Sequence, residues 1–148
     1  PQRHGARREE RGARGRWRLW KCGARGMLTV TLPWPARVLH PNARPHWRVK
    51  AKAAKAARAT AYALALQAGA MRMQWPDGRL HLWIDFYPPD RRRRDDDGLL
   101  ASVKAARDGM ADAMGVDDHR FVSHPMLREE VRKGGQVVMT VTGGPCAA

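Results

Sequence analysis

The stretch LHLWIDFYPPDRRRRDDDG, residues 80–98, decides how this chain is built. Its first eight residues alternate, so that Leu80, Leu82, Ile84 and Phe86 fall on one face, which predicts a half-buried β-strand over residues 80–87. Two prolines at 88 and 89 then end regular strand pairing. The predicted strand is therefore followed closely by a run of four arginines and three aspartates.

That charged run is the strongest candidate for chemistry. If Asp95 to Asp97 is still extended, the period of two puts Asp95 and Asp97 on one side and Asp96 on the other. Two carboxylates in a small volume repel unless a cation lies between them, and Mg²⁺ is held by one or two carboxylates plus substrate phosphates. Guanidinium groups bind phosphate oxygens bidentately. The run predicts a metal site joined to a polyanion clamp; a solvated loop of mutually neutralising charges is the alternative interpretation.

The sequence after this run predicts one helix and two strands. Apolar residues recur at helical spacing over residues 99–114 and form a core stripe, made of Leu99, Val103, Ala106, Met110 and Met114. Asp108 and Asp112 lie off that stripe and are expected to face solvent. A short turn with Asp117 and Asp118 follows. We expect strands over 121–131 and 136–141, paired as an antiparallel hairpin around a tight reversal at 133–135.

The sequence before it predicts a strand over residues 27–32, a loop over 36–46 and a helix over 47–68. The helix carries a basic stripe at spacings of four, three and three, made of Arg48, Lys52, Lys55 and Arg58. This stripe is a candidate track for a nucleic-acid backbone, together with Asn42 on the loop; an ordinary exposed helix face is the alternative. The order β-α-β-α-β-β indicates an α+β fold with a mixed sheet of about four strands and two main helices.

Composition narrows the possible partners. The chain has 148 residues and a formal net charge of +14, which favours nucleic acid as a partner and an anionic membrane surface second. No apolar stretch is long enough to span a membrane, and the basic helix has mostly alanine opposite its charges. The two cysteines, Cys22 and Cys146, form no CxxC pair and suggest a reducing cytosolic setting. The six histidines are scattered, which argues against zinc.

The ends of the chain differ from its body. Residues 1–26 hold eight Arg and one Lys against two Glu, a local charge of +7. We expect a disordered basic arm there, or upstream sequence translated from a start ahead of Met27. The tail, residues 144–148, is expected to be loose, so residues 27–143 form the expected domain.

Three stretches together resemble the RusA family of Holliday junction resolvases. They are Thr31-Leu32-Pro33-Trp34-Pro35, the central segment from Pro89 to Asp97, and Asp117-Asp118. The Lys-Gly-Gly reversal fits as well. The resemblance covers residues 27–143, and the run of arginines leading into Asp-x-Asp is far more specific than a lone pair of aspartates.

The resemblance implies a homodimeric, Mg²⁺-dependent endonuclease, with Mn²⁺ as a substitute, that makes paired nicks in four-way DNA junctions during recombination and repair. It implies a cytoplasmic, nucleoid-associated protein of a bacterium or a phage-infected cell, with no membrane and no nucleotide cofactor. By position, Asp95, Asp97 and Asp118 take the metal-binding and catalytic roles, with Asp117 a weaker candidate. Four arginines, Arg91, Arg92, Arg93 and Arg94, would hold the junction arms.

The sequence departs from the family at two positions of the central motif. Gly98 stands where the family has Asn, and Ala101 stands where it has Lys. Lys104, seven residues after Asp97, returns to about the same helix face and is the candidate replacement. A non-catalytic or degenerate branched-DNA-binding module is the alternative. An Asp-x-Asp glycosyltransferase is disfavoured because no Gly-rich phosphate loop follows a strand, and a calcium loop because Leu99 and Ala106 fall where ligands are required.

Overall fold

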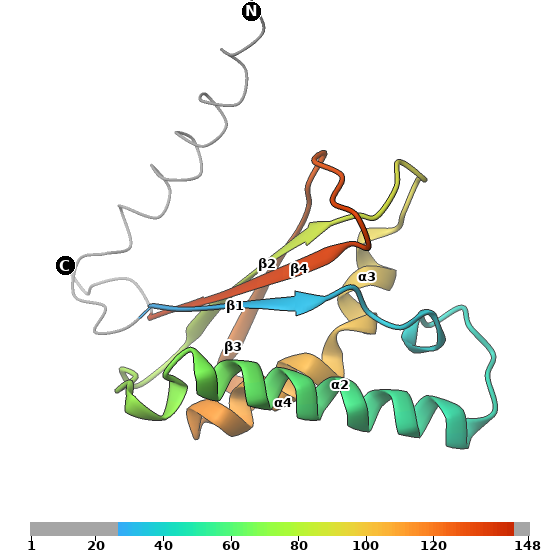
Figure 1. Ribbon diagram of the computed structural model, residues 1–148. Helices are drawn as coiled ribbons and strands as arrows, with labels where there is room; N and C mark the ends of the chain where they lie inside the picture. The colour runs from blue at the N-terminus through green and yellow to red at the C-terminus, as the bar shows by residue number, and fades with distance from the viewer. Residues whose placement is uncertain (1–26, 144–148) are drawn as a thin grey trace, which may run out of the picture.

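The computed structural model describes residues 27–143, which form one mixed four-stranded sheet with helices on one face (Figure 1). The expected arm at 1–26 and tail at 144–148 lie outside the described residues. The predicted α+β class is confirmed. In chain order the strands and main helices are β1 (Met27–Pro33), α2 (Trp47–Gln67), β2 (Leu80–Tyr87), α3 (Asp96–Ser102), α4 (Lys104–Met114), β3 (Phe121–Leu127) and β4 (Gln136–Thr142).

The strand order in the sheet is β1-β4-β2-β3. β4 runs antiparallel to both β1 and β2, whereas β3 pairs with β2 in parallel, with Leu80 opposite Phe121. The helical segment between β2 and β3 is the crossover that a parallel pair requires. In β2 the predicted apolar face is confirmed, because Leu80, Leu82, Ile84 and Phe86 are at most 1% exposed.

The predicted hairpin of β3 and β4 is wrong, because β2 lies between these strands. Pro125 gives β3 no backbone donor at that position, and such a strand belongs at a sheet edge. β4 is the better inner strand, since Val137, Met139 and Val141 are fully buried. The tight turn at 133–135 exists, with Gly134 and Gly135 at positive φ, but it joins strands that do not pair. β3 also ends at Leu127, earlier than the predicted 131.

The single helix predicted over 99–114 is divided into α3 and α4 at Val103. The Ser102 hydroxyl donates to the Leu99 carbonyl oxygen at 2.7 Å, which competes with the helical hydrogen-bond ladder at the break. The predicted core stripe is nevertheless confirmed, since its five members are 8% exposed or less. Helix α3 begins at Asp96, three residues before the predicted start.

Helices α2 and α4 cross at close range beneath the sheet (Figure 1). A Cβ atom at Gly109 of α4 would lie 2.2 Å from the Arg58 carbonyl oxygen of α2, so glycine allows the two backbones to approach. Ala61 and Ala65 are fully buried on the α2 side. Within residues 27–143, no helix has both the length and the apolar character of a membrane span.

Candidate active site

The charged loop, Asp90–Asp97, leaves the carboxyl end of β2 and leads into α3. Asp95 is the N-cap residue of α3 and has an extended backbone, whereas Asp96 and Asp97 already belong to the first helical turn. The extended alternation considered for Asp95 to Asp97 is therefore wrong, because the helix begins earlier than predicted. All three aspartates still line one surface hollow, together with Arg93 and Arg94.

The three aspartates of this hollow are available for a ligand. Their residues are exposed, and among residues 27–143 no side chain donates a hydrogen bond to these carboxylates or forms an ion pair with them. They lie at the N-terminal end of a helix, where the backbone dipole favours negative charge. The three carboxylates are therefore accessible to a cation from solvent.

The four arginines of the loop divide into two groups. Arg91, Arg92 and Arg93 are exposed, and the Arg92 side chain is 86% exposed. The Arg94 side chain is only 16% exposed, and its guanidinium bonds to Asp90 and to the Arg92 carbonyl oxygen. Three arginines thus face solvent, where a phosphate can reach them, although Arg92 Nε also lies 3.8 Å from Asp90 Oδ2. The fourth, Arg94, is held within the loop.

A second group of charges, the α4 cluster, consists of Asp108, Asp112 and Asp118 with Arg58. Arg58 Nε donates to Asp112 Oδ2 at 2.7 Å. Burial raises the pKa of Asp108, and the charge of Asp118 raises it further. Asp108 Oδ1 is shielded from solvent and has no hydrogen-bond partner among the described residues. The expectation that Asp108 simply faces solvent is wrong, because the Asp118 segment packs beside it.

Asp118 begins the short 3-10 helix η3 (Asp118–Arg120), directly before β3. Arg107 of α4 holds this segment by donating to the Asp118 and Phe121 carbonyl oxygens, each at 3.1 Å. Asp117 caps η3 by accepting from the His119 N–H at 2.9 Å, which lowers the pKa of Asp117. Asp117 therefore has a local structural role, and Asp118 is the acid that meets Asp108.

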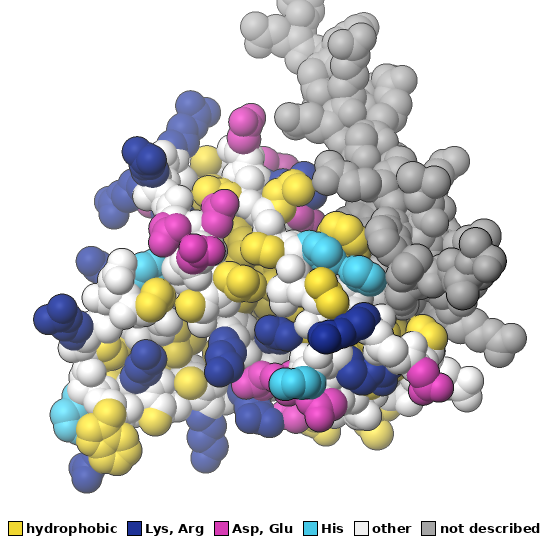
Figure 2. All heavy atoms as spheres, turned by 180° about the vertical axis from the view of Figure 1, so that it is seen from behind, with side chains coloured by type: hydrophobic (Ala, Val, Ile, Leu, Met, Phe, Trp, Pro, Cys, Tyr) yellow, Lys and Arg dark blue, Asp and Glu magenta, His cyan; other side chains and the backbone are white. Residues whose placement is uncertain are grey.

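The charged loop and the α4 cluster lie at opposite ends of β2. The loop follows Tyr87 at the end of β2, whereas Asp118 precedes Phe121, which pairs with Leu80 at its start. From its first to its last residue, the eight-residue strand β2 rises about 3.3 Å per step and is roughly 23 Å long. Figure 2 shows acidic side chains in separate groups on one face, among lysines and arginines. One chain brings Asp95 and Asp97 together but does not bring Asp118 to them.

Consistent with this separation, residues 27–143 contain no group of three His, Cys, Asp or Glu side chains placed to hold one metal ion. The available donors nevertheless fit a hard cation. The three exposed carboxylates of the loop line one hollow, and Asp108 Oδ1 is a shielded acceptor with the charges of Asp118, Arg58 and Lys104 around it. Oxygen donors suited to a hard cation are therefore present in two separate groups.

Comparisons with known proteins indicate the family of this chain. No protein-family model matches the chain. An uncharacterized protein of Xylella fastidiosa (strain Temecula1) is 54% identical over 123 residues, which cover 82% of this chain and 80% of that protein. Crossover junction endodeoxyribonuclease RusA of Escherichia coli (strain K12) is 30% identical over 119 residues, which cover 77% of this chain and 92% of RusA. The chain belongs to the RusA family.

One departure from the RusA-family motif has a local structural reason. A Cβ atom at Gly98, where the family has Asn, would lie 2.5 Å from His40 Nε2 and 3.0 Å from His40 Cε1. The imidazole is held by its Nδ1, which accepts the Asn42 N–H at 3.2 Å. The His40 ring thus occupies the space into which a side chain at position 98 would extend.

The other departure concerns the lysine of the RusA-family motif. Lys104 is exposed and begins α4, one helical turn before Asp108. Its positive charge acts on the Asp108 carboxyl and lowers the pKa, against the larger effect of burial. Lys104 therefore belongs electrostatically to the α4 cluster. Sequence reasoning missed Asp108 as part of this cluster; its spacing of four from both Lys104 and Asp112 was the available signal.

The predicted DNA-binding stripe of α2 is exposed over Arg48, Lys52 and Lys55. Arg58, its last member, is engaged by Asp112 of α4. Asn42 is exposed, and its backbone N–H binds His40. The stripe thus presents three exposed cations along the first half of α2, of which Arg48 lies over the Trp47 ring, and the fourth links α2 to the α4 cluster.

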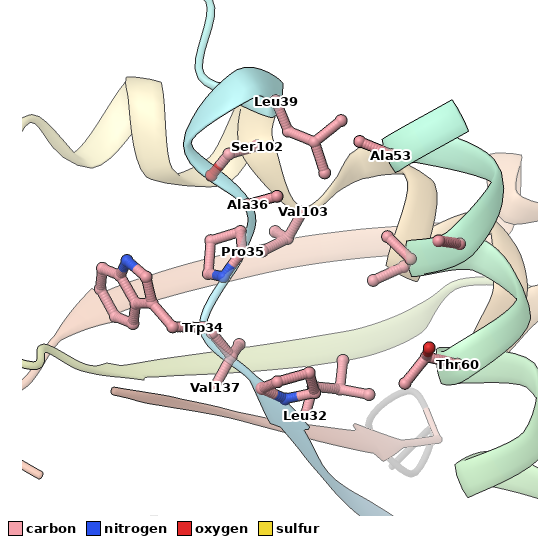
Figure 3. A pocket seen from close by; sticks show the side chains of 14 residues that line it. Leu32, Trp34, Pro35, Ala36, Leu39, Ala53, Thr60, Ser102, Val103 and Val137 are labelled. Carbon is pink, nitrogen blue, oxygen red and sulfur yellow. The ribbon is translucent and has the colours of Figure 1, made fainter. Parts of the chain in front are cut away.

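An apolar pocket of about 230 Å³ lies between α2, the α3–α4 junction and the segment after β1 (Figure 3). Trp34, Pro35 and Leu39 line one side, and Ala53 of α2 lines another. Within the described part of the chain no acidic or basic side chain lines it, and the Ser102 hydroxyl is bonded to Leu99. The acidic and basic side chains of the candidate site therefore lie on the charged surface and not in this pocket.

Proposed function

We propose that this chain is a Mg²⁺-dependent endodeoxyribonuclease that cuts four-way DNA junctions by paired nicks, in recombination and repair. Membership of the RusA family and the match to E. coli RusA support the reaction. The observation that carries the proposal is the hollow at the end of β2, where free carboxylates adjoin a run of arginines. Acids and phosphate-binding cations beside one another are what a metal-assisted phosphodiesterase requires.

The working form in this proposal is a symmetric homodimer. Asp95 and Asp97 of one chain and Asp118 of the other, with Asp108 beside it, would hold the cation, because a single chain separates these groups by the length of β2. Two-fold symmetry makes the exchange reciprocal and produces two identical sites, one for each strand to be cut. When bound, Mg²⁺ would supply a water of lowered pKa and stabilise charge on the scissile phosphate; Mn²⁺ would substitute.

The remaining residues would bind and orient the DNA. Arg91, Arg92 and Arg93 provide exposed guanidinium groups for phosphate oxygens next to the carboxylates. Helix α2 would guide an arm of the junction along Arg48, Lys52 and Lys55, with Asn42 on the adjoining loop. Lys104 would add positive charge near the reacting phosphate. These contacts are mostly to the DNA backbone, so junction shape would dominate recognition over sequence.

The test is Asp97→Asn with Asp96→Asn as its matched control, because both acids line the hollow and both changes remove one charge. Each variant is incubated with a labelled synthetic four-way junction in Mg²⁺ and in EDTA. We expect D97N to bind the junction without nicking it and D96N to nick within about fivefold of the wild type. Metal-independent nicking, or nicking by D97N, contradicts the proposal. A wild-type chain that only shifts the junction in a gel would instead be a non-catalytic binding module.

A further inference from the structure

One of the four arginines, Arg94, is built into the protein. Its Nη1 donates to the Asp90 and Arg92 carbonyl oxygens, each at 3.0 Å, and its Nη2 donates to Asp90 Oδ1 at 2.7 Å. Asp90 also accepts the Arg92 backbone N–H at 3.0 Å. The guanidinium therefore closes the loop from Asp90 to Arg94 into one hydrogen-bonded turn directly before Asp95.

The same guanidinium is attached to the core through Trp34. Arg94 Cζ lies 5.3 Å from the centroid of the indole ring, a cation–π contact. Trp34 packs edge-on against Phe86 of β2 at 6.2 Å, and Gly135 lies so close to it that a Cβ atom there would come within 2.9 Å. Arg94 is thus held between the loop it closes and a rigid aromatic platform on the sheet.

We propose that Arg94 is a positioning residue, which fixes the loop so that Asp95 and Asp97 are presented as a preformed pair for the cation. This inference rests on the proposed function. A planar fork can bond to three oxygens and stack on an indole at once, whereas an ammonium group cannot. Releasing Arg94 toward DNA would break those bonds and leave Asp90 Oδ1 without its charged donor. Arg91, Arg92 and Arg93 remain the arginines for phosphate.

The test compares Arg94→Lys and Arg94→Gln with Arg93→Gln, which removes the same charge from an exposed position. Junction affinity is measured in EDTA, and the nicking rate and the Mg²⁺ requirement are measured with saturating junction. We expect R94K and R94Q to nick roughly 10–100-fold more slowly and to need more Mg²⁺, the scale of losing a group that orients a metal ligand. R94K should bind the junction within about twofold of the wild type. R93Q should lose activity through KM, with kcat retained.

A structural readout accompanies these rates. Hydrogen exchange of the peptide covering residues 88–97 should be faster in R94K and R94Q than in the wild type, and unchanged in R93Q, because the Arg94 guanidinium makes the bonds that close the turn and Arg93 lies at an exposed position. Asp90→Asn breaks the same network from its other side and should reproduce the R94K pattern. This second variant keeps the test decisive if an Arg94 variant unfolds, which a thermal melt reports.

Two results would overturn the inference. In the first, R94K has the kcat and the Mg²⁺ requirement of the wild type, and R94Q loses only junction affinity. Arg94 would then be another phosphate contact. The other is unchanged loop exchange in R94K and in D90N. A wild-type chain that does not nick contradicts the proposed function separately, and Mn²⁺ affinity measured by electron paramagnetic resonance then decides the positioning role. Lower affinity in R94K than in R93Q supports it, and equal affinity overturns it.

Discussion

The charged loop and the α4 cluster use the same side chain, aspartate, in opposite electrostatic settings. Asp95 and Asp97 are exposed, stand at a helix N-terminus and follow four arginines. Asp108 is shielded, faces Asp118 and has a raised pKa. The difference teaches that one residue type is accessible to a cation in the loop, whereas in the cluster it is shielded beside a second carboxylate. β2 separates the two regions within a chain.

The largest expected effect comes from removing Asp118. If both regions form one site, Asp118→Asn should lower the nicking rate about 1,000-fold, equivalent to about 4 kcal/mol of barrier, although it lies far from the loop. Asp117→Asn is the control, since Asp117 caps η3 and should change the rate by less than tenfold. The measurement is single-turnover nicking of a saturating junction. Wild-type rates in D118N would leave the loop as the whole site.

The next prediction disturbs the packing of α4 and leaves the charged loop unchanged. Gly109→Ala places a methyl group against the Arg58 carbonyl oxygen, so it should destabilise the fold by roughly 1–3 kcal/mol through overpacking. Chemical denaturation measures the loss. Ala61→Gly should not restore stability in the double variant, because the obstructing atom is backbone. Full rescue by A61G would show that the helices can move apart freely.

A smaller effect is expected at the other crowded glycine, beside the loop. Gly98→Asn restores the family residue but meets the His40 ring, and we expect a loss of about 1 kcal/mol in unfolding free energy. Here the obstruction is a side chain, so His40→Ala combined with G98N should recover most of that loss. Thermal melts of both single variants and the double variant test the coupling. Strictly additive melts would rule out this contact.

The smallest effect concerns pH, and it distinguishes protonation of histidine side chains from protonation of carboxylates. His81 Nδ1 and His124 Nε2 lie 2.7 Å apart on the sheet, and burial lowers the pKa of both rings. The unfolded chain therefore takes up more protons, and stability present above about pH 6.5 is lost as pH falls through the lowered values.

Melting temperatures recorded from pH 7.5 to pH 5 measure this loss. His124→Gln should flatten the curve by a few degrees, whereas the change His119→Gln at an exposed position should leave its shape unaltered. Identical slopes in all three proteins would assign the acid sensitivity elsewhere, to groups other than this pair.

Local patterns were sufficient to predict the elements before and within the central stretch. The alternation in β2, the alanine-rich helix α2 and the core stripe from Leu99 to Met114 follow from side-chain period alone. The pairing of the strands could not be predicted in this way. The turn at 133–135 does not decide which strand pairs with β4, because that choice depends on which strand can be buried on both sides. Pro125 was the available signal that β3 belongs at an edge.

For the candidate site, the resemblance to the RusA family indicated residues but not their arrangement. Position in the family motif gave Asp95, Asp97 and Asp118 as candidates, but it cannot show that a parallel β2–β3 pair places them at opposite ends. Nor does a run of four like residues reveal that Arg94 turns inward, since that depends on Trp34, sixty positions earlier. The burial of Asp108 likewise arises from a contact with η3 that only the folded chain creates.

The most direct test of a site shared between two chains is complementation. D97N and D118N chains are co-expressed with different tags, and the heterodimer is purified on both. If Asp97 of one chain works with Asp118 of the other, the heterodimer keeps one intact site, so it should nick one strand of a junction at about half the wild-type rate while each parent homodimer is inactive. A heterodimer as inactive as its parents would contradict the account.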